Sequence, residues 1–141
     1  MAHPDYDSWE RRRLTTNQIR LDPQNPRLPL SATDLRQDKI RDYLVTHEDV
    51  TGIAKKISVD GFIPFEPIFV VKEGAYFYVV EGNRRICSLQ LLLDPEKAPA
   101  TRQYIFKKYA QNMDISAIEK VSVYIATDRE NVRKIIYSRH A

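Results

Sequence analysis

The stretch that decides the fold is PIFVVKEGAYFYVVEGNRRICSLQLLL, residues 67–93. Two runs of β-branched and aromatic residues, 67–71 and 75–80, flank the turn-forming tripeptide KEG at 72–74. This pattern predicts a β-hairpin. The second predicted strand leads through a short polar junction into an apolar run, residues 86–93, which predicts a buried helix.

Elsewhere the chain alternates between helical and extended patterns. Three prolines within residues 22–29 disfavour helix there and indicate a rigid extended segment. Apolar spacing and turn residues predict the other elements. We expect helices over residues 4–13, 34–46, 50–59, 101–111 and 129–139, and strands over residues 14–21 and 121–126.

Composition narrows the function classes only slightly. The chain has 141 residues, a net charge of +3 and a pI near 9.0, so it fits one globular domain with a mild preference for phosphate-bearing partners. Cys87 is the single cysteine, and the histidines are dispersed, so neither a disulfide nor a zinc site is predicted. The polar start and the lack of a long apolar run predict a cytoplasmic protein without a membrane partner.

The polar junction at residues 81–85, Glu81-Gly82-Asn83-Arg84-Arg85, fits an anion site at the start of a helix. Glycine allows a phosphate to approach the backbone, asparagine is a favourable N-cap, and arginine donors match phosphate oxygens. Adjacent arginines on a helix diverge by about 100°, so one is expected to contact the ligand and the other to support the site. A plain turn with solvated or ion-paired arginines is the alternative. The position of one of only four glycines between strand and helix favours the anion site.

Four short motifs, taken in order, resemble the N-terminal domain of ParB-type proteins. They are NPR at 25–27, GFI at 61–63, PIFV at 67–70 and GNRR at 82–85, and the resemblance covers residues 19–126. It implies an α+β fold of the ParB/sulfiredoxin type, with a small mixed sheet and helices packed around it.

The resemblance also implies a domain organisation. Residues 1–18 would form an N-terminal arm or helix, and residues 19–128 a nucleotide-binding domain. Residues 129–141 would begin a further helix, and we expect the chain to be cut from a longer protein.

By the same resemblance, the ligand would be CTP or another nucleoside triphosphate, with Mg²⁺ as a further candidate and no metal site made by the protein alone. The full-length protein would bind DNA, could form a homodimer, and would act in chromosome or plasmid partition or in phage defence. The residues implied to bind the nucleotide and its phosphates are Gly82, Asn83, Arg84, Arg85, Asn25, Arg27, Gly61 and Pro67.

The chain departs from the ParB pattern in places. Asn83 occupies a position where ParB proteins have glutamate, and we assign the family's E-N-x-x-R box to residues 137–140, which read YSRH. Sulfiredoxin activity is not predicted, because its cysteine would be at Asn83, while Cys87 lies four residues later and fits a small core residue.

Two alternative functions remain open. Glu81 would be the catalytic residue of a metal-dependent NTPase or nuclease, holding a metal or orienting water, although it also fits a surface carboxylate paired with an arginine. Alternatively, the arginine pair would bind nucleic-acid phosphates directly, without a nucleotide.

Overall fold

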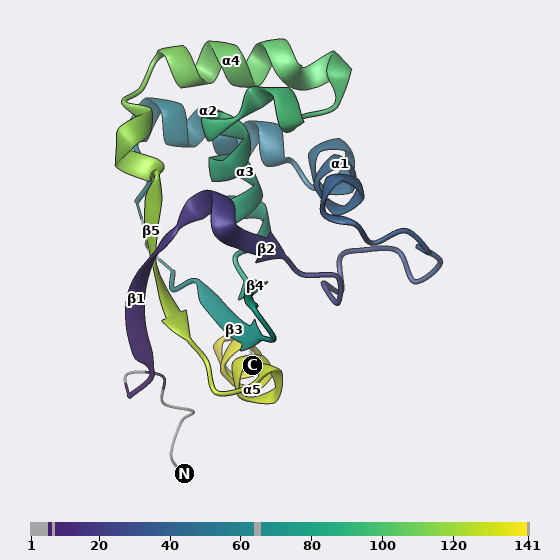
Figure 1. Ribbon diagram of the computed structural model, residues 1–141, viewed down its shortest axis with the longest axis vertical. Helices are drawn as coiled ribbons and strands as arrows, with labels where there is room; N and C mark the ends of the chain where they lie inside the picture. The colour runs from purple at the N-terminus through teal and green to yellow at the C-terminus, as the bar shows by residue number, and fades with distance from the viewer. Residues whose placement is uncertain (1–5, 7, 64–65, 141) are drawn as a thin grey trace.

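The computed structural model describes residue 6, residues 8–63 and residues 66–140, with the side chains of 138–140 left aside. Its described part is an α+β fold in which one mixed five-stranded sheet has the order β1-β5-β3-β4-β2 (Figure 1). The expected α+β class and mixed sheet are therefore confirmed. The strands are β1 (Glu10–Thr15), β2 (Ile19–Leu21), β3 (Phe69–Glu73), β4 (Tyr76–Glu81) and β5 (Lys120–Ile125). The α-helices are α1 (Gln37–His47), α2 (Val50–Asp60), α3 (Asn83–Leu93), α4 (Gln103–Gln111) and α5 (Arg129–His140). Short 3-10 turns are η1 (Thr16–Gln18), η2 (Pro95–Lys97), η3 (Ala100–Arg102) and η4 (Ile115–Ile118).

The predicted hairpin is confirmed and forms the middle of the sheet. Strands β3 and β4 pair antiparallel, and Gly74 in their turn has a φ of 63°, which glycine adopts without strain. Strand β5 runs parallel to β3, and the short β2 runs parallel to β4. The carboxyl ends of β2 and β4 therefore lie at the same edge of the sheet, where α3 begins.

Alternating residues of the central strands feed two separate hydrophobic cores. On β3, Val70 belongs to the larger core, whereas Phe69 and Val71 belong to the smaller one. Helices α1 to α4 cover the larger core and α5 covers the smaller one, on the opposite side of the sheet (Figure 1). Because the first three residues of β3 are buried on both faces, this part of the strand is a continuous apolar run, whereas Lys72 and Glu73 are exposed.

Several sequence-based boundaries were wrong. Among the described residues of 4–13, the expected helix is absent. Residues 10–15 instead form the edge strand β1, which pairs antiparallel with β5. Residues 1–5 and 7 lie outside the described residues. The strand expected over 14–21 is interrupted by η1, whose Thr16 hydroxyl donates to the Ile118 carbonyl. In both cases the local structure is set by contacts with residues about a hundred positions later, the strand β5 and the Ile118 carbonyl.

The other predicted elements are present with shifted ends. Helix α1 begins at Gln37, three residues late, because the carboxylate of Asp34 accepts hydrogen bonds from the backbone and guanidinium of Arg36 and forms a turn there. Helix α3 begins at Asn83, three residues early. No helix within the described part of the chain is long and apolar enough to cross a membrane.

Candidate functional site

The β4–α3 junction has an open helix start that requires glycine. Gly82 is the N-cap of α3 and has a φ of 110°, and a Cβ there would lie 3.1 Å from a side-chain carbon of Ile68. The backbone N–H of Ile86 donates the first helical bond to the Gly82 carbonyl, at 2.9 Å. The amides before it have no intrahelical acceptor, so the positive end of the helix dipole faces outward.

The first turn of this helix borders a cleft of about 590 Å³, which we call the α3 cleft; Asn83 and Arg84 line it, whereas Gly82 does not. It lies between the loop that follows β2, the end of β4, the first turn of α3 and one face of α5. Its size is within the usual range for small-molecule sites. Its lining residues are Asp22, Gln24, Asn25, Pro26, Arg27, Val80, Glu81, Asn83, Arg84, Arg129, Arg133, Ile136 and Tyr137.

The two adjacent arginines of α3 have different positions. The guanidinium of Arg85 donates to the backbone carbonyls of Glu66, at 2.6 Å, and Pro67, at 3.2 Å. Arg84 lines the α3 cleft, and its side chain has no hydrogen bond or ion pair within the described residues. Arg84 is therefore placed to meet a ligand, while Arg85 fastens the segment before β3.

Asn83 connects three segments and is not the N-cap that we expected. Its Oδ1 accepts the backbone N–H of Asp22 at 2.9 Å, and its Nδ2 donates to the Val79 carbonyl at 3.0 Å. With 7% exposure, the side chain is buried. Gly82 takes the N-cap position because its left-handed backbone turns the chain directly from β4 into the helix. The Asn83 amide thus ties the loop after β2 to the end of β4.

The loop after β2 places a buried donor without an acceptor at the α3 cleft. Asn25 is 7% exposed, and its Oδ1 accepts the backbone N–H of Arg27 at 3.0 Å. That bond fixes the amide so that Nδ2 is the free end, and this buried nitrogen has no acceptor in the described structure. Arg27 lines the same cleft and pairs with Glu48 at 2.7 Å. A buried donor of this kind is costly unless a ligand or water accepts from it.

Helix α5 supplies cleft residues that were not predicted as site residues. Arg129 donates to the Asp22 carboxylate at 2.7 Å and to the Glu73 carboxylate at 2.8 Å, which ties α5 to the loop and to β3. These bonds raise the pKa of Arg129 and lower that of Glu73. Arg133, four residues on, has no hydrogen bond or ion pair in the described part of the chain. The sequence did offer a signal for these two residues: Arg129 and Arg133 are four residues apart and so lie on the same polar face of the predicted amphipathic helix.

Two polar residues in the first turn of α5 lie outside the α3 cleft. Glu130 and Asn131 do not line the α3 cleft: Glu130 lies 3.9 Å from Lys134, and Asn131 donates to Asp128. Neither side chain is therefore placed to meet a ligand in that cleft.

Gly61 and Pro67 do not reach the α3 cleft. Gly61 ends α2 with a φ of 79°, as expected for a helix C-cap glycine. Pro67 lines a different hollow with Tyr6 and Arg11, and its carbonyl accepts a hydrogen bond from Arg85 at the junction. Residues 64 and 65 of the intervening loop lie outside the described residues.

Glu81 lies at the end of β4 and lines the α3 cleft. Its carboxylate has no hydrogen bond or ion pair within the described residues, so the expected pairing with an arginine is not observed. The described residues contain no group of three or more histidine, cysteine, aspartate or glutamate side chains able to hold a metal. Cys87 is buried, which raises the pKa of its thiol to about 12 and fits a core residue.

Comparisons with known proteins do not assign this site to a family. No protein-family model matches the chain, and a search of curated proteins finds no match. The resemblance to ParB-type proteins therefore rests on the short motifs and stays a prediction.

Proposed function

We propose that the α3 cleft binds the phosphates of a nucleoside triphosphate. The observation that carries the proposal is the buried Nδ2 of Asn25, which has no acceptor among the described residues, at the same cleft as Arg84 and the first turn of α3. Residues that line or border one cleft thus offer donors of three kinds: an amide, a guanidinium and the positive end of a helix. Phosphate oxygens accept hydrogen bonds from all three.

The roles of individual residues follow from their present contacts. Arg84 and Arg133 would bind the phosphates, because neither has a protein partner in the described structure. Asn25 would donate to a phosphate or sugar oxygen. Asn83 and Arg85 would act indirectly, by holding the loop after β2 and the segment before β3.

The broader role extends the same proposal. With CTP or another nucleotide bound, a ParB-like protein would change how its full-length form, as a homodimer, engages DNA in the cytoplasm, in partition or phage defence. The α3 cleft would then sense the nucleotide. Helix α5 would respond to it, because Arg133 and Tyr137 line the cleft from that helix.

A second candidate function is hydrolysis with Glu81 as the catalytic residue. It is favoured by the position of the Glu81 carboxylate, which lines the cleft without a protein partner in the described residues. Mg²⁺ is commonly held by one or two carboxylates together with substrate phosphates, so Glu81 suffices as a protein ligand. The ion would neutralise phosphate charge, while Glu81 holds it or orients the attacking water.

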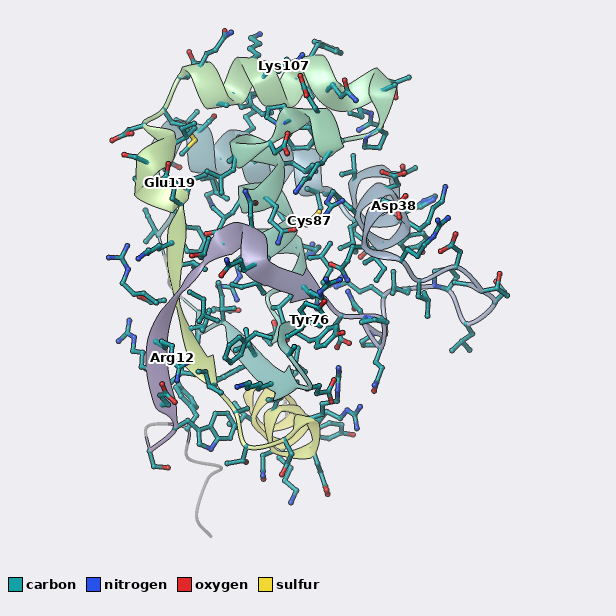
Figure 2. The ribbon with its side chains drawn as sticks, viewed as in Figure 1. Arg12, Asp38, Tyr76, Cys87, Lys107 and Glu119 are labelled. Atoms are coloured by element: carbon teal, nitrogen blue, oxygen red, sulfur yellow. The ribbon has the colours of Figure 1, made fainter. Side chains whose placement is uncertain are left out.

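The binding proposal is tested by calorimetric titration of CTP, ATP and GTP, with and without Mg²⁺. Arg84→Ala should weaken binding at least tenfold, about 1.4 kcal/mol. Lys107→Ala is the matched control, because Lys107 lies on the outer side of α4, far from the cleft (Figure 2), and its loss removes the same charge. Equal affinities for Arg84→Ala and the wild type, or no binding of any of the three nucleotides, would contradict the proposal.

Two further measurements separate the alternatives. Phosphate release or DNA nicking with Mg²⁺ that Glu81→Gln abolishes would establish hydrolysis. DNA binding that needs no nucleotide and weakens steeply with salt would favour direct contact between the arginines and nucleic-acid phosphates.

A further inference from the structure

A second cleft lies at the edge strand β2, and neither the predicted motifs nor the proposed function uses it. We call it the β2 cleft; its volume is about 580 Å³. It is bordered by β2, the start of β4, α1, α3 and η2. Its lining residues are Asn17, Gln18, Ile19, Arg20, Gln37, Arg41, Ala75, Tyr76, Phe77, Gln90 and Lys97. The lining contains three cationic side chains and no carboxylate.

Arg41 of α1 is a buried cation that forms no hydrogen bond or ion pair through its side chain within the described residues. It is 9% exposed, and its Nε is shielded from solvent without a hydrogen-bond acceptor in the described structure. No ion pair or hydrogen bond engages its guanidinium among the described residues. A guanidinium stays charged at any physiological pH, so it cannot relieve burial by losing a proton. An anionic group from outside the described chain would satisfy it.

Gln90 of α3 adds a buried acceptor to the same cleft. Its Nε2 donates to the backbone carbonyls of Ile19, at 2.7 Å, and Thr16, at 3.1 Å. These bonds fix the orientation of the amide, so Oε1 is the remaining end. That oxygen is buried, at a residue 3% exposed, and receives no hydrogen bond within the described residues. It requires a donor such as a hydroxyl group.

Other side chains shape the space around these two atoms. Arg20 lies over the Tyr76 ring, with 3.7 Å between the guanidinium carbon and the ring centroid, and Figure 2 shows Tyr76 just below β2. Phe77 adds an apolar wall. Gln37 closes the outer edge of β2 by exchanging two hydrogen bonds with the backbone of Leu21, at 2.7 and 2.8 Å. The ligand would therefore approach beside β2 rather than pair with it.

We propose that the β2 cleft binds a small phosphorylated sugar, with the phosphate on Arg41 and a sugar hydroxyl donating to Gln90 Oε1. The phosphate supplies the acceptor oxygens that the guanidinium lacks, and the hydroxyl supplies the missing donor. Arg20 and Lys97 add positive charge beside the phosphate. This site is separate from the α3 cleft and does not depend on nucleotide binding there.

The probe for the test is ribose 5-phosphate, titrated by calorimetry beside inorganic phosphate and unphosphorylated ribose. The wild type should bind ribose 5-phosphate, bind phosphate more weakly and ignore ribose. Arg41→Met should lose at least tenfold in affinity, because it keeps the side-chain volume but not the charge. Lys39→Met is the matched control, since Lys39 is an exposed cation on the same helix. Its affinity should equal that of the wild type.

Two comparisons decide the outcome. Arg84→Ala should bind ribose 5-phosphate like the wild type; a loss there, with none in Arg41→Met, would place the phosphate in the α3 cleft and overturn the second site. Urea unfolding should show Arg41→Met to be at least as stable as the wild type, because an unpaired buried charge has been removed. A wild type that binds neither probe, or an Arg41→Met protein that cannot fold, would also overturn the proposal, since Arg41 would then serve the fold through solvent.

Discussion

The α3 cleft and the β2 cleft have nearly equal volumes, about 590 and 580 Å³, but the half-buried Arg129 of the first and the buried Arg41 of the second are in opposite situations. In the α3 cleft, the Arg129 side chain is 12% exposed and forms ion pairs with two carboxylates. These ion pairs hold α5 against the rest of the domain. In the β2 cleft, Arg41 is buried with no partner within the described residues. An arginine held by carboxylates stabilises the fold, whereas a buried arginine without a partner among the described residues is a candidate contact for a ligand. The same residue type thus predicts opposite effects of substitution.

The largest effect should come from breaking the buried pair. Arg129→Met leaves the Asp22 carboxylate, whose side chain is 3% exposed, without its cation. We expect a loss of about 3 kcal/mol in the free energy of unfolding, because an uncompensated buried charge is strongly destabilising. Urea denaturation measures it directly. Arg41→Met, in the other cleft, should show no loss.

A control on the same helix separates burial from charge. Lys134→Met removes a cation that lies 3.9 Å from Glu130, with both side chains mostly exposed. Its effect should stay below about 0.5 kcal/mol, as for exposed ion pairs. If Arg129→Met and Arg41→Met cost the same, the contrast between the two clefts would be wrong.

A smaller loss should follow from Asn83→Ala. The substitution removes the bond from Asp22 N–H and the bond to the Val79 carbonyl, leaving buried backbone groups unpaired. We expect about 2 kcal/mol of destabilisation. Urea denaturation gives the loss, and Asn112→Ala, at the exposed C-cap of α4, should change stability by less than about 0.5 kcal/mol.

The same variant tests the role of Asn83 in the α3 cleft. An Asn83→Ala protein with wild-type stability but weakened nucleotide binding would show that its amide contacts the ligand. The opposite result is a lower free energy of unfolding with unchanged nucleotide affinity. It would show that the Asn83 amide acts by holding the loop after β2 against β4.

Much of the fold could be predicted because its central elements are locally unambiguous. The β3–β4 hairpin has turn chemistry between two apolar runs, and Gly82 lies where the chain must turn into α3. Strand β1 could not be found in this way. Its basic residues carry no strand pattern, and only the backbone of β5, more than a hundred residues later, gives them partners.

The α3 cleft was predicted in part for a similar reason. Arg84, Asn25 and Arg27 lie in short motifs, and the structure brings them together in one cleft. Local sequence does not tell which polar atoms become buried without partners. The free nitrogen of Asn25 depends on the bond to Arg27 N–H, and the isolation of Arg41 depends on how α1 packs over β2. The whole β2 cleft was therefore missed.

The smallest predicted effect concerns the exposed half of the Arg129 bridge. Arg129 lowers the pKa of Glu73 from 4.5, so the charged carboxylate stabilises the fold above pH 4.5, and this stability is lost as the pH falls through the lowered value. Because the Glu73 side chain is 46% exposed, solvent screening should keep the contribution below about 1 kcal/mol. Urea midpoints of the wild type and Glu73→Gln should differ slightly at pH 6 and converge as the pH falls below the lowered pKa of Glu73, where both side chains are uncharged. A difference at pH 6 well above about 1 kcal/mol, lost as the pH falls, would mean that Glu73, and not Asp22, is the principal partner of Arg129. The contrast between a paired and an unpaired buried arginine would then rest on a surface contact.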